Sequence, residues 1–125
     1  MPIEFSIETL ATAAELQAGP GTVRPAVSFD AIDGVVPRLI VEPSDTERLA
    51  STLAWAAREN LRVVVRGGGT KLEWGPSPTA VDLILSTVRL NALVDHRHGD
   101  LTATVQAGAK LGEVNRQLKQ HGQWL

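Results

Sequence analysis

Three consecutive glycines directly after a β-branched run constrain this chain more than any other feature of its sequence. Residues 61–65 contain three successive valines and are typical of a buried strand. The loop that follows reads Arg66-Gly67-Gly68-Gly69-Thr70-Lys71. Glycine takes positive φ readily and exposes bare backbone amides, so an anion can approach the backbone closely. The residues therefore fit a phosphate cradle and, equally well, a flexible turn between two strands.

Two familiar phosphate-binding patterns do not fit this loop. A P-loop requires Gly-Lys followed by Ser or Thr at the start of a helix, whereas here Thr70 precedes Lys71. The dinucleotide fingerprint G-x-G-x-x-G, started at Gly67, meets Leu72 at its last glycine position. Two prolines and a glycine within residues 75–78 also disfavour a helix directly after the loop. A bound phosphate would therefore rest on loop amides and not on a following helix dipole.

Composition excludes several classes of function. The 125 residues suffice for one domain or one large subdomain, and a 43% hydrophobic content with 21% charged residues is ordinary for a soluble globular chain. A net charge of −2 without a basic cluster argues against a nucleic-acid partner. The chain has no cysteine, which excludes thiolate nucleophiles and disulfides within it. Residues 1–5 lack signal-peptide features and no apolar stretch reaches membrane-spanning length, so we expect a cytoplasmic protein.

The first half of the chain reads as alternating helices and extended segments. Residues 6–18 have helical spacing of apolar positions with Ser6 as N-cap, and residues 20–37 read as an extended arm containing an Asp33-Gly34 turn. A short strand is expected at 38–41. A capping box then predicts a helix with Ser44 as N-cap and Glu47 three residues on. Its apolar face is expected to comprise Leu49, Ala50, Leu53, Ala54 and Ala57.

The second half adds strands and a terminal helix. Strands are expected at 80–85 and 101–106, with a further short strand or turn at 90–94 and a polar turn at 95–100. A helix is expected from about residue 110, with a buried stripe of Leu111, Val114 and Leu118. The strand–helix–strand run at 38–65 is compact enough for a βαβ unit with parallel strands. The fold class is therefore α+β, with a small parallel sheet flanked by helices.

The order of these motifs resembles a known family. Residues 37–75 give strand, helix, strand and glycine loop, followed by "VDLILSTVRLN" and "HGDLTATVQAGAKLGEVNRQLKQHGQWL". Over about residues 30–125 this resembles the FAD-binding domain of the vanillyl-alcohol-oxidase (PCMH) type, and within it the FAD-binding subunit of bacterial glycolate oxidase. The resemblance implies an N-terminal helix and arm at 1–36 and, at 37–125, the first α/β-like subdomain of the FAD-binding domain. It also strongly favours the phosphate interpretation of the loop.

The resemblance implies specific cofactor contacts. The FAD pyrophosphate would bind on Arg66, Gly67, Gly68, Gly69, Thr70 and Lys71. Pro43 matches the family segment that lines the nucleotide side, Gly75 matches the loop exit, and Gly108 matches a strand end near the cofactor. Relatives with covalent flavin often carry a histidine where this chain has Thr70, so noncovalent FAD is expected.

The resemblance also implies that part of the domain is missing. Family members continue beyond the segment matching residues 122–125 into a second, antiparallel subdomain, and FAD lies between the two. We therefore expect this chain to bind FAD weakly or not at all, to be catalytically incompetent alone, and to self-associate through an apolar face around Trp124 and Leu125.

The implied reaction is oxidation of a 2-hydroxy acid such as glycolate, with hydride transfer from the α-carbon to flavin N5. No nucleophile–base pair, paired catalytic carboxylates or metal-ligand set is evident in the sequence, so no catalytic or metal residue is assigned, and other oxidase subunits are expected as partners. Two alternatives remain: a noncatalytic nucleotide- or anion-binding module, and an interaction fragment whose loop binds nothing.

The sequence also suggests roles for two histidines, two tryptophans and Arg66. His96 and His98 fit a solvated turn better than a metal site. Trp55 and Trp74 are both expected to pack in the core. Arg66 is expected beside the cradle, with Glu73 as an alternative partner.

Overall fold

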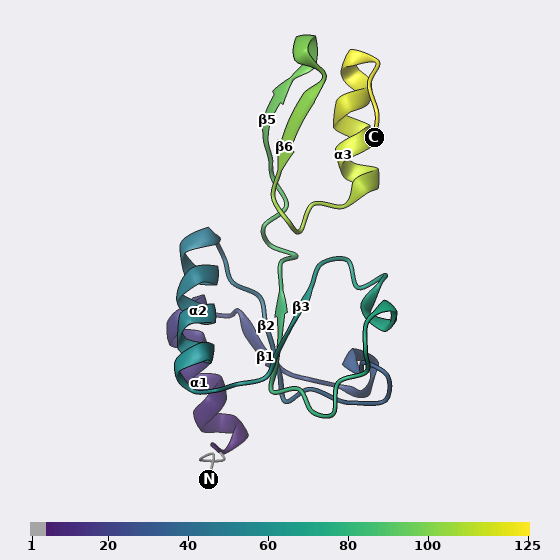
Figure 1. Cartoon of the computed structure of the whole chain (residues 1–125). Helices are drawn as coiled ribbons and strands as arrows, with labels where there is room; N and C mark the ends of the chain where they lie inside the picture. Colours follow the sequence, from purple (N-terminus) through teal and green to yellow (C-terminus); the bar gives the residue numbers. More distant parts are fainter. Residues whose placement is uncertain (1–4) are drawn as a thin grey trace.

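A computed structural model describes residues 5–125 of the chain (Figure 1). It shows a body built around a β-sheet and an arm, residues 93–125, that extends from this body. The body's sheet contains four strands in the order β1-β2-β4-β3. Strands β2 and β3 both run parallel to β4, and β1 runs antiparallel to β2. The strand bounds are β1 Val23–Pro25, β2 Leu39–Val41, β3 Val63–Arg66 and β4 Leu83–Ser86.

The sheet separates two apolar clusters. Helices α1 (Ile7–Ala18) and α2 (Thr46–Arg58) lie together on one face (Figure 1). The cluster on this side contains Leu10, Ala14, Ala18, Leu39, Val41, Trp55, Ala56, Leu83 and Leu85. The opposite face is covered by the loops of segments 26–35 and 72–81, around Ile32, Ile40, Val81 and Ile84. The α+β class with a small, mostly parallel sheet is therefore confirmed.

Strand β4 lies in the middle of the parallel set because it is apolar on both faces. All four of its residues are buried, and it hydrogen-bonds β2 on one side and β3 on the other. Such a strand gains most from a central position, where both of its faces are covered. The expected βαβ unit at 38–65 is thus present with parallel strands, but β4 separates the two.

Helix α2 begins one residue later than the sequence predicts. Its N-cap is Asp45, whose carboxylate accepts a hydrogen bond from the Arg48 amide at 2.8 Å, so the assignment of Ser44 was wrong. Of the expected apolar face, Leu49 packs against the core, but the other four residues were assigned wrongly. The helix turns Trp55 toward the sheet, since burying this ring removes more apolar surface from water than burying several alanines. Its buried residues are Thr52, Trp55 and Ala56, whereas Ala50, Leu53, Ala54 and Ala57 are exposed.

The arm consists of a β-hairpin and one helix (Figure 1). Strands β5 (Leu93–Arg97) and β6 (Thr102–Val105) pair antiparallel, and α3 (Leu111–Leu118) follows them. Residues 95–97 continue β5, so the predicted polar turn at 95–100 shrinks to its second half, at His98–Asp100. Helix α3 buries Val114 and Leu118, but Leu111 is exposed, contrary to the sequence-based prediction.

The arm's far end gathers the three histidines of the chain. His98 stacks on His121 with ring centroids 4.2 Å apart, and the His96 ring nitrogen lies 2.9 Å from the Gln123 side-chain oxygen. The chain then turns back along α3, where Leu125 hydrogen-bonds Asn115, and both Trp124 and Leu125 are exposed. These contacts fix the end of the chain against the hairpin.

Within residues 5–125, no helix combines the length and apolar character that crossing a bilayer requires. Residues 1–4, on which the signal-peptide argument partly rests, lie outside the described part of the chain. The grouping of residues 37–125 into one subdomain stays a prediction.

Candidate functional site

A cavity of about 530 Å³ opens where β3 ends in the glycine loop. One wall is the loop itself, and the opposite wall comes from the N-terminal segment that includes the short helical turn Ser28–Asp30. The lining includes five of the nine predicted site residues: Arg66, Gly67, Gly68, Gly69 and Thr70. The structure therefore brings the central part of the predicted site together in the wall of one cavity.

The loop glycines leave room for a ligand. A Cβ added at Gly68 would meet no atom within 4 Å, and one at Gly67 would meet only ordinary contacts of 3.7 Å or more. Gly69 has a φ of +75°, a conformation that other residues adopt at a cost. Its open side lies against the Arg66 side chain, since a Cβ there would be 3.5 Å from the Arg66 Cδ. The loop thus presents the backbone at Gly68 without side-chain cover.

A buried carboxylate holds the cationic side of the cavity in place. The Asp30 side chain is 2% exposed and accepts hydrogen bonds from both Nη atoms of Arg24, at 2.8 and 2.9 Å. It also accepts one from Arg66 Nη1 at 3.0 Å and one from the Val27 amide at 2.9 Å. The Arg24 guanidinium, with these further donors, holds the pKa of the Asp30 carboxyl well below its usual range. Arg66 thus pairs with Asp30, and no contact with Glu73 is formed.

Sequence reasoning missed Asp30. It lies 36 residues before Arg66, in a segment that reads as an irregular arm, and no local pattern links the two. Only the packing of segment 26–35 over the open sheet face brings the carboxylate to the end of β3.

Two exposed aromatic rings flank the cavity. Phe29 is 94% exposed and Trp74 is 79% exposed, and both line the opening. The core placement predicted for Trp74 was therefore wrong, while that for Trp55 is confirmed. Trp74 lies in a 3-10 turn after the loop, where no second layer covers it. Large apolar groups left in water at a cavity mouth are typical of a ligand-contacting surface.

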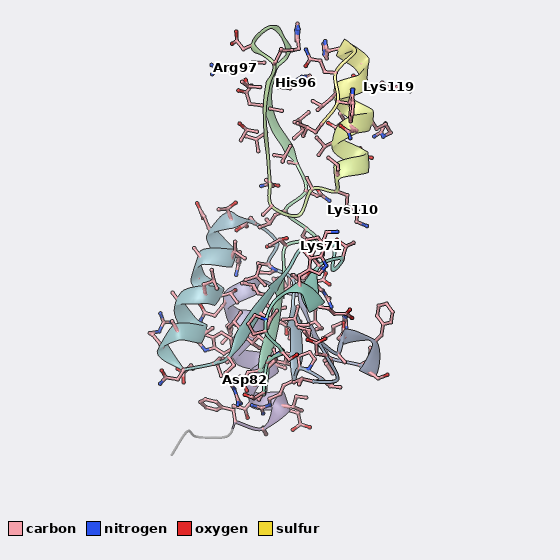
Figure 2. All side chains as sticks on the ribbon, turned by 45° about the vertical axis from the view of Figure 1, so that its right-hand side comes forward. Lys71, Asp82, His96, Arg97, Lys110 and Lys119 are labelled. Carbon is pink, nitrogen blue, oxygen red and sulfur yellow. The ribbon has the colours of Figure 1, made fainter. Side chains whose placement is uncertain are left out.

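The lysines near the loop differ in position. Lys71 lies on the back of the loop, and its Nζ is 4.4 Å from the centroid of the Trp74 ring. Lys110, just before α3, lines the main cavity. Figure 2 shows Lys71 and Lys110 at the junction between body and arm. Lys110 was not selected from the sequence, because only the turn at the base of the arm carries it toward the loop.

The remaining predicted site residues lie away from the cavity wall. Pro43 is buried between β2 and α2, and Gly75 is in open space beyond the 3-10 turn. Gly108 is buried where the arm joins the body, and its amide donates to the Leu90 carbonyl at 2.7 Å. A Cβ on Gly108 would lie 1.7 Å from the Thr87 carbonyl oxygen, so close backbone packing requires glycine there.

A second buried carboxylate serves the fold at the opposite end of the sheet. Asp82 accepts three hydrogen bonds from Arg62, at 2.7, 2.9 and 3.0 Å, and Arg38 lies 4.0 Å away. Hydrogen bonds from Arg62 lower the pKa of the Asp82 carboxyl. Figure 2 shows Asp82 at the end of the body farthest from Lys71. The hydrogen bonds that it accepts from Arg62 give it a structural role.

Acid is expected to destabilise the protein through these two carboxyls. Both have native pKa values below the value of about 3.9 found in unfolded chains, so the unfolded state takes up protons first. The stabilisation is complete above about pH 5 and is lost as the pH falls below about 4. Urea unfolding of the wild type, Asp30→Asn and Asp82→Asn across this range measures it. Each variant should be less stable at neutral pH and show a shallower acid dependence, and a flat wild-type profile would contradict the expectation.

Comparison with known proteins identifies the family. The family model described as "FAD binding domain" matches residues 37–125. This chain belongs to that family. The resemblance to FAD-binding domains of the vanillyl-alcohol-oxidase type is thereby confirmed, and FAD is the cofactor of the domain.

Two curated relatives are similar to part of this chain. D-2-hydroxyglutarate dehydrogenase of Xanthomonas citri pv. viticola is 35% identical over 86 residues, which make up 69% of this chain and 18% of that protein. Glycolate oxidase subunit GlcD of Bacillus subtilis is 29% identical over 87 residues, or 70% of this chain and 18% of the relative. The chain thus spans less than a fifth of the length of these relatives.

Solved structures support the fold. Alkyldihydroxyacetonephosphate synthase superimposes with a TM-score of 0.72 at 20% identity, covering 97% of this chain and 26% of that chain. The grass pollen allergen Phl p 4, which has glucose dehydrogenase activity, gives a TM-score of 0.72 at 18% identity, covering 90% and 27%. At these identities the likeness concerns the fold alone.

The residues present fit the diphosphate of FAD. The loop offers bare amides with open space above Gly68 and only ordinary contacts at Gly67, the Thr70 hydroxyl, and N–H groups of Arg66 at the same cavity. Fixed amides and a guanidinium are the donors that phosphate oxygens accept from in proteins.

Proposed function

We propose that this chain is the FAD-anchoring part of a flavin-dependent oxidoreductase that oxidises a 2-hydroxy acid, such as glycolate, to a 2-oxo acid. The observation that carries the proposal is the uncovered glycine loop at the end of β3, facing a cavity whose opposite wall is a fixed arginine–carboxylate cluster. The names of the relatives, D-2-hydroxyglutarate dehydrogenase, D-lactate dehydrogenase and glycolate oxidase subunit, support the choice of substrate class.

In this proposal the glycine loop holds the cofactor's diphosphate. Gly67, Gly68 and Gly69 donate backbone N–H groups, Thr70 donates its hydroxyl, and Arg66 supplies the positive charge. FAD, when bound, accepts the hydride equivalent removed from the hydroxy acid. Since Thr70 has no nucleophilic ring nitrogen, the proposed attachment is noncovalent.

The chain is proposed to supply only part of the complete site. The cavity mouth is open, and among residues 5–125 its lining contains no histidine that could take a proton from the substrate. A cofactor held on one wall keeps much of its surface in water, which lowers its affinity. We therefore propose that further sequence or other oxidase subunits complete the cleft, and that the isolated chain binds FAD weakly and self-associates through exposed Trp124, Leu125 and Leu101.

An NMR titration of the 15N-labelled chain with FAD, ADP and riboflavin tests the anchoring role. FAD and ADP share the diphosphate, so both are expected to shift the amide signals of residues 67–70. Riboflavin lacks phosphate and is expected to leave these signals unchanged. Weak binding is measurable in this way, and unchanged loop signals at saturating FAD would contradict the proposal. Equal shifts with riboflavin would show that the loop does not recognise the diphosphate.

A further inference from the structure

We propose that Asp30 is a positioning residue that presents the Arg66 guanidinium to the phosphate groups of a ligand on the glycine loop; this rests on the anchoring function proposed above. Asp30 and its second partner Arg24 lie before residue 37, outside the region that the family model matches. The proposal therefore assigns part of the site to the N-terminal segment.

The Asp30 carboxylate is held in one position by its hydrogen bonds. Its two oxygens accept four hydrogen bonds, two from Arg24, one from Arg66 and one from the Val27 amide. A side chain that is 2% exposed and fully hydrogen-bonded has little freedom to change rotamer. It can therefore hold the guanidinium groups of Arg24 and Arg66 in a defined position.

The Arg66 guanidinium is held by Asp30 through one nitrogen and has further N–H groups that can reach a ligand. Its side chain is 18% exposed, and its stem lies against the open side of Gly69. Only Nη1 donates to a side chain, namely Asp30, and among residues 5–125 no acceptor takes a hydrogen bond from Nε or Nη2. Because Arg66 lines the cavity, these remaining N–H groups are the donors left for a phosphate oxygen.

The charge of the cluster is consistent with this role. Two guanidinium groups share one carboxylate, so Arg24, Asp30 and Arg66 together carry a net charge of +1. The carboxylate orders the arginines without cancelling their attraction for an anion. An arginine ordered before the ligand arrives loses less conformational freedom on binding.

Asp30→Asn gives a test in which charge and positioning predict opposite results. Removing a negative charge beside an anion site would strengthen ADP binding if only the net charge mattered. If Asp30 positions Arg66, the same variant should weaken ADP binding by about tenfold or more, the value of one charge-assisted hydrogen bond. Unchanged or tighter ADP binding by folded Asp30→Asn would overturn the proposal.

Asp82→Asn is the matched control. Asp82 is also a buried carboxylate between two arginines, but it lies at the other end of the sheet and does not line the cavity. Both variants should lower the melting temperature, yet only Asp30→Asn should lower the ADP affinity measured well below that temperature. Equal losses of affinity in the two variants would mean that Asp30 acts only through the stability of the fold and does not position Arg66.

The order of the Arg66 side chain gives a readout that needs no ligand, and its first part needs only the wild type. In the wild type, the 15N–1H NOE of Arg66 Nε should be as high as that of backbone amides in β3, whereas the exposed Arg58 should be mobile. In Asp30→Asn, but not in Asp82→Asn, Arg66 should become mobile. A mobile Arg66 in the wild type would overturn the proposal even if ADP binds. A rigid Arg66 without any ADP binding would instead count against the anchoring function alone.

Discussion

Gly108→Ala is expected to lower the free energy of unfolding by more than about 3 kcal/mol. The added Cβ would lie 1.7 Å from the Thr87 carbonyl oxygen and 2.7 Å from that of Leu90, and neither backbone group is a flexible side-chain end. The clash also opposes the hydrogen bond from the Gly108 amide to the Leu90 carbonyl, which fixes the arm to the body. Urea unfolding at neutral pH measures the loss. Domains are typically stable by only about 5–15 kcal/mol, so a loss of this size would remove a large part of the free energy of unfolding.

Gly112→Ala is the matched control for this substitution. Gly112 lies in α3, and a Cβ there would meet nothing within 4 Å. Alanine has the higher helix propensity, so this variant should be unchanged or more stable by up to about 1 kcal/mol. If Gly108→Ala were as stable as the wild type, the close approach of residues 87 and 108 would be refuted. Because the measurement needs no FAD, it separates a structural role of Gly108 from the predicted cofactor contact.

Gly68→Asp is expected to weaken FAD and ADP binding at least about fivefold while leaving stability within about 0.5 kcal/mol of the wild type. A Cβ at this position meets nothing within 4 Å, and the residue does not have a positive φ, so the fold should accept the side chain. The new carboxylate would face the ligand phosphates. Each like-charge pair at about 4 Å costs between about 1 kcal/mol in water and about 4 kcal/mol near a protein surface. The expected loss of affinity is therefore from about fivefold to several hundredfold.

Gly75→Asp tests whether that loss is local. It introduces the same charge, also in open space, but Gly75 does not line the cavity. The NMR titration with ADP should give near wild-type affinity for Gly75→Asp and a large loss for Gly68→Asp. Similar losses in both variants would mean that general repulsion, or a cofactor contact at Gly75, explains the effect. Unaltered binding by Gly68→Asp would remove the glycine loop from the phosphate site.

Features that depend on neighbouring residues were predictable from the sequence. Ser6 caps α1 through the Thr9 amide, as helix-start chemistry requires. Asp33 and Gly34 both have positive φ in the predicted turn, and three valines lead into the glycine loop where β3 ends. Each result follows from backbone preferences that act over a few residues.

Features that depend on which surfaces meet were not predictable in this way. The one-residue shift to Asp45 and the rotation of α2 follow from the gain of burying Trp55 against the sheet. Trp74 has the same side chain but no layer above it, so it stays exposed at the cavity mouth. Apolar character alone does not distinguish these two tryptophans, because burial needs an opposing surface.

By itself, the sequence determined the order of α1, α2 and α3 with strands β2, β3, β4 and β6, and the bare glycine loop after β3, since local φ/ψ preferences and apolar periodicity specify them. Strand β1, in the segment read as an extended arm, was not predicted. Tertiary structure decided that β4 separates β2 from β3, that Gly108 meets the backbone at Thr87, and that Asp30 reaches Arg66 across 36 residues. Such contacts form because distant segments bury apolar surface together, and the polar groups buried with that surface must then form hydrogen bonds within the protein. The arginine and the carboxylate were visible in the chain, but their pairing was a consequence of the packed sheet.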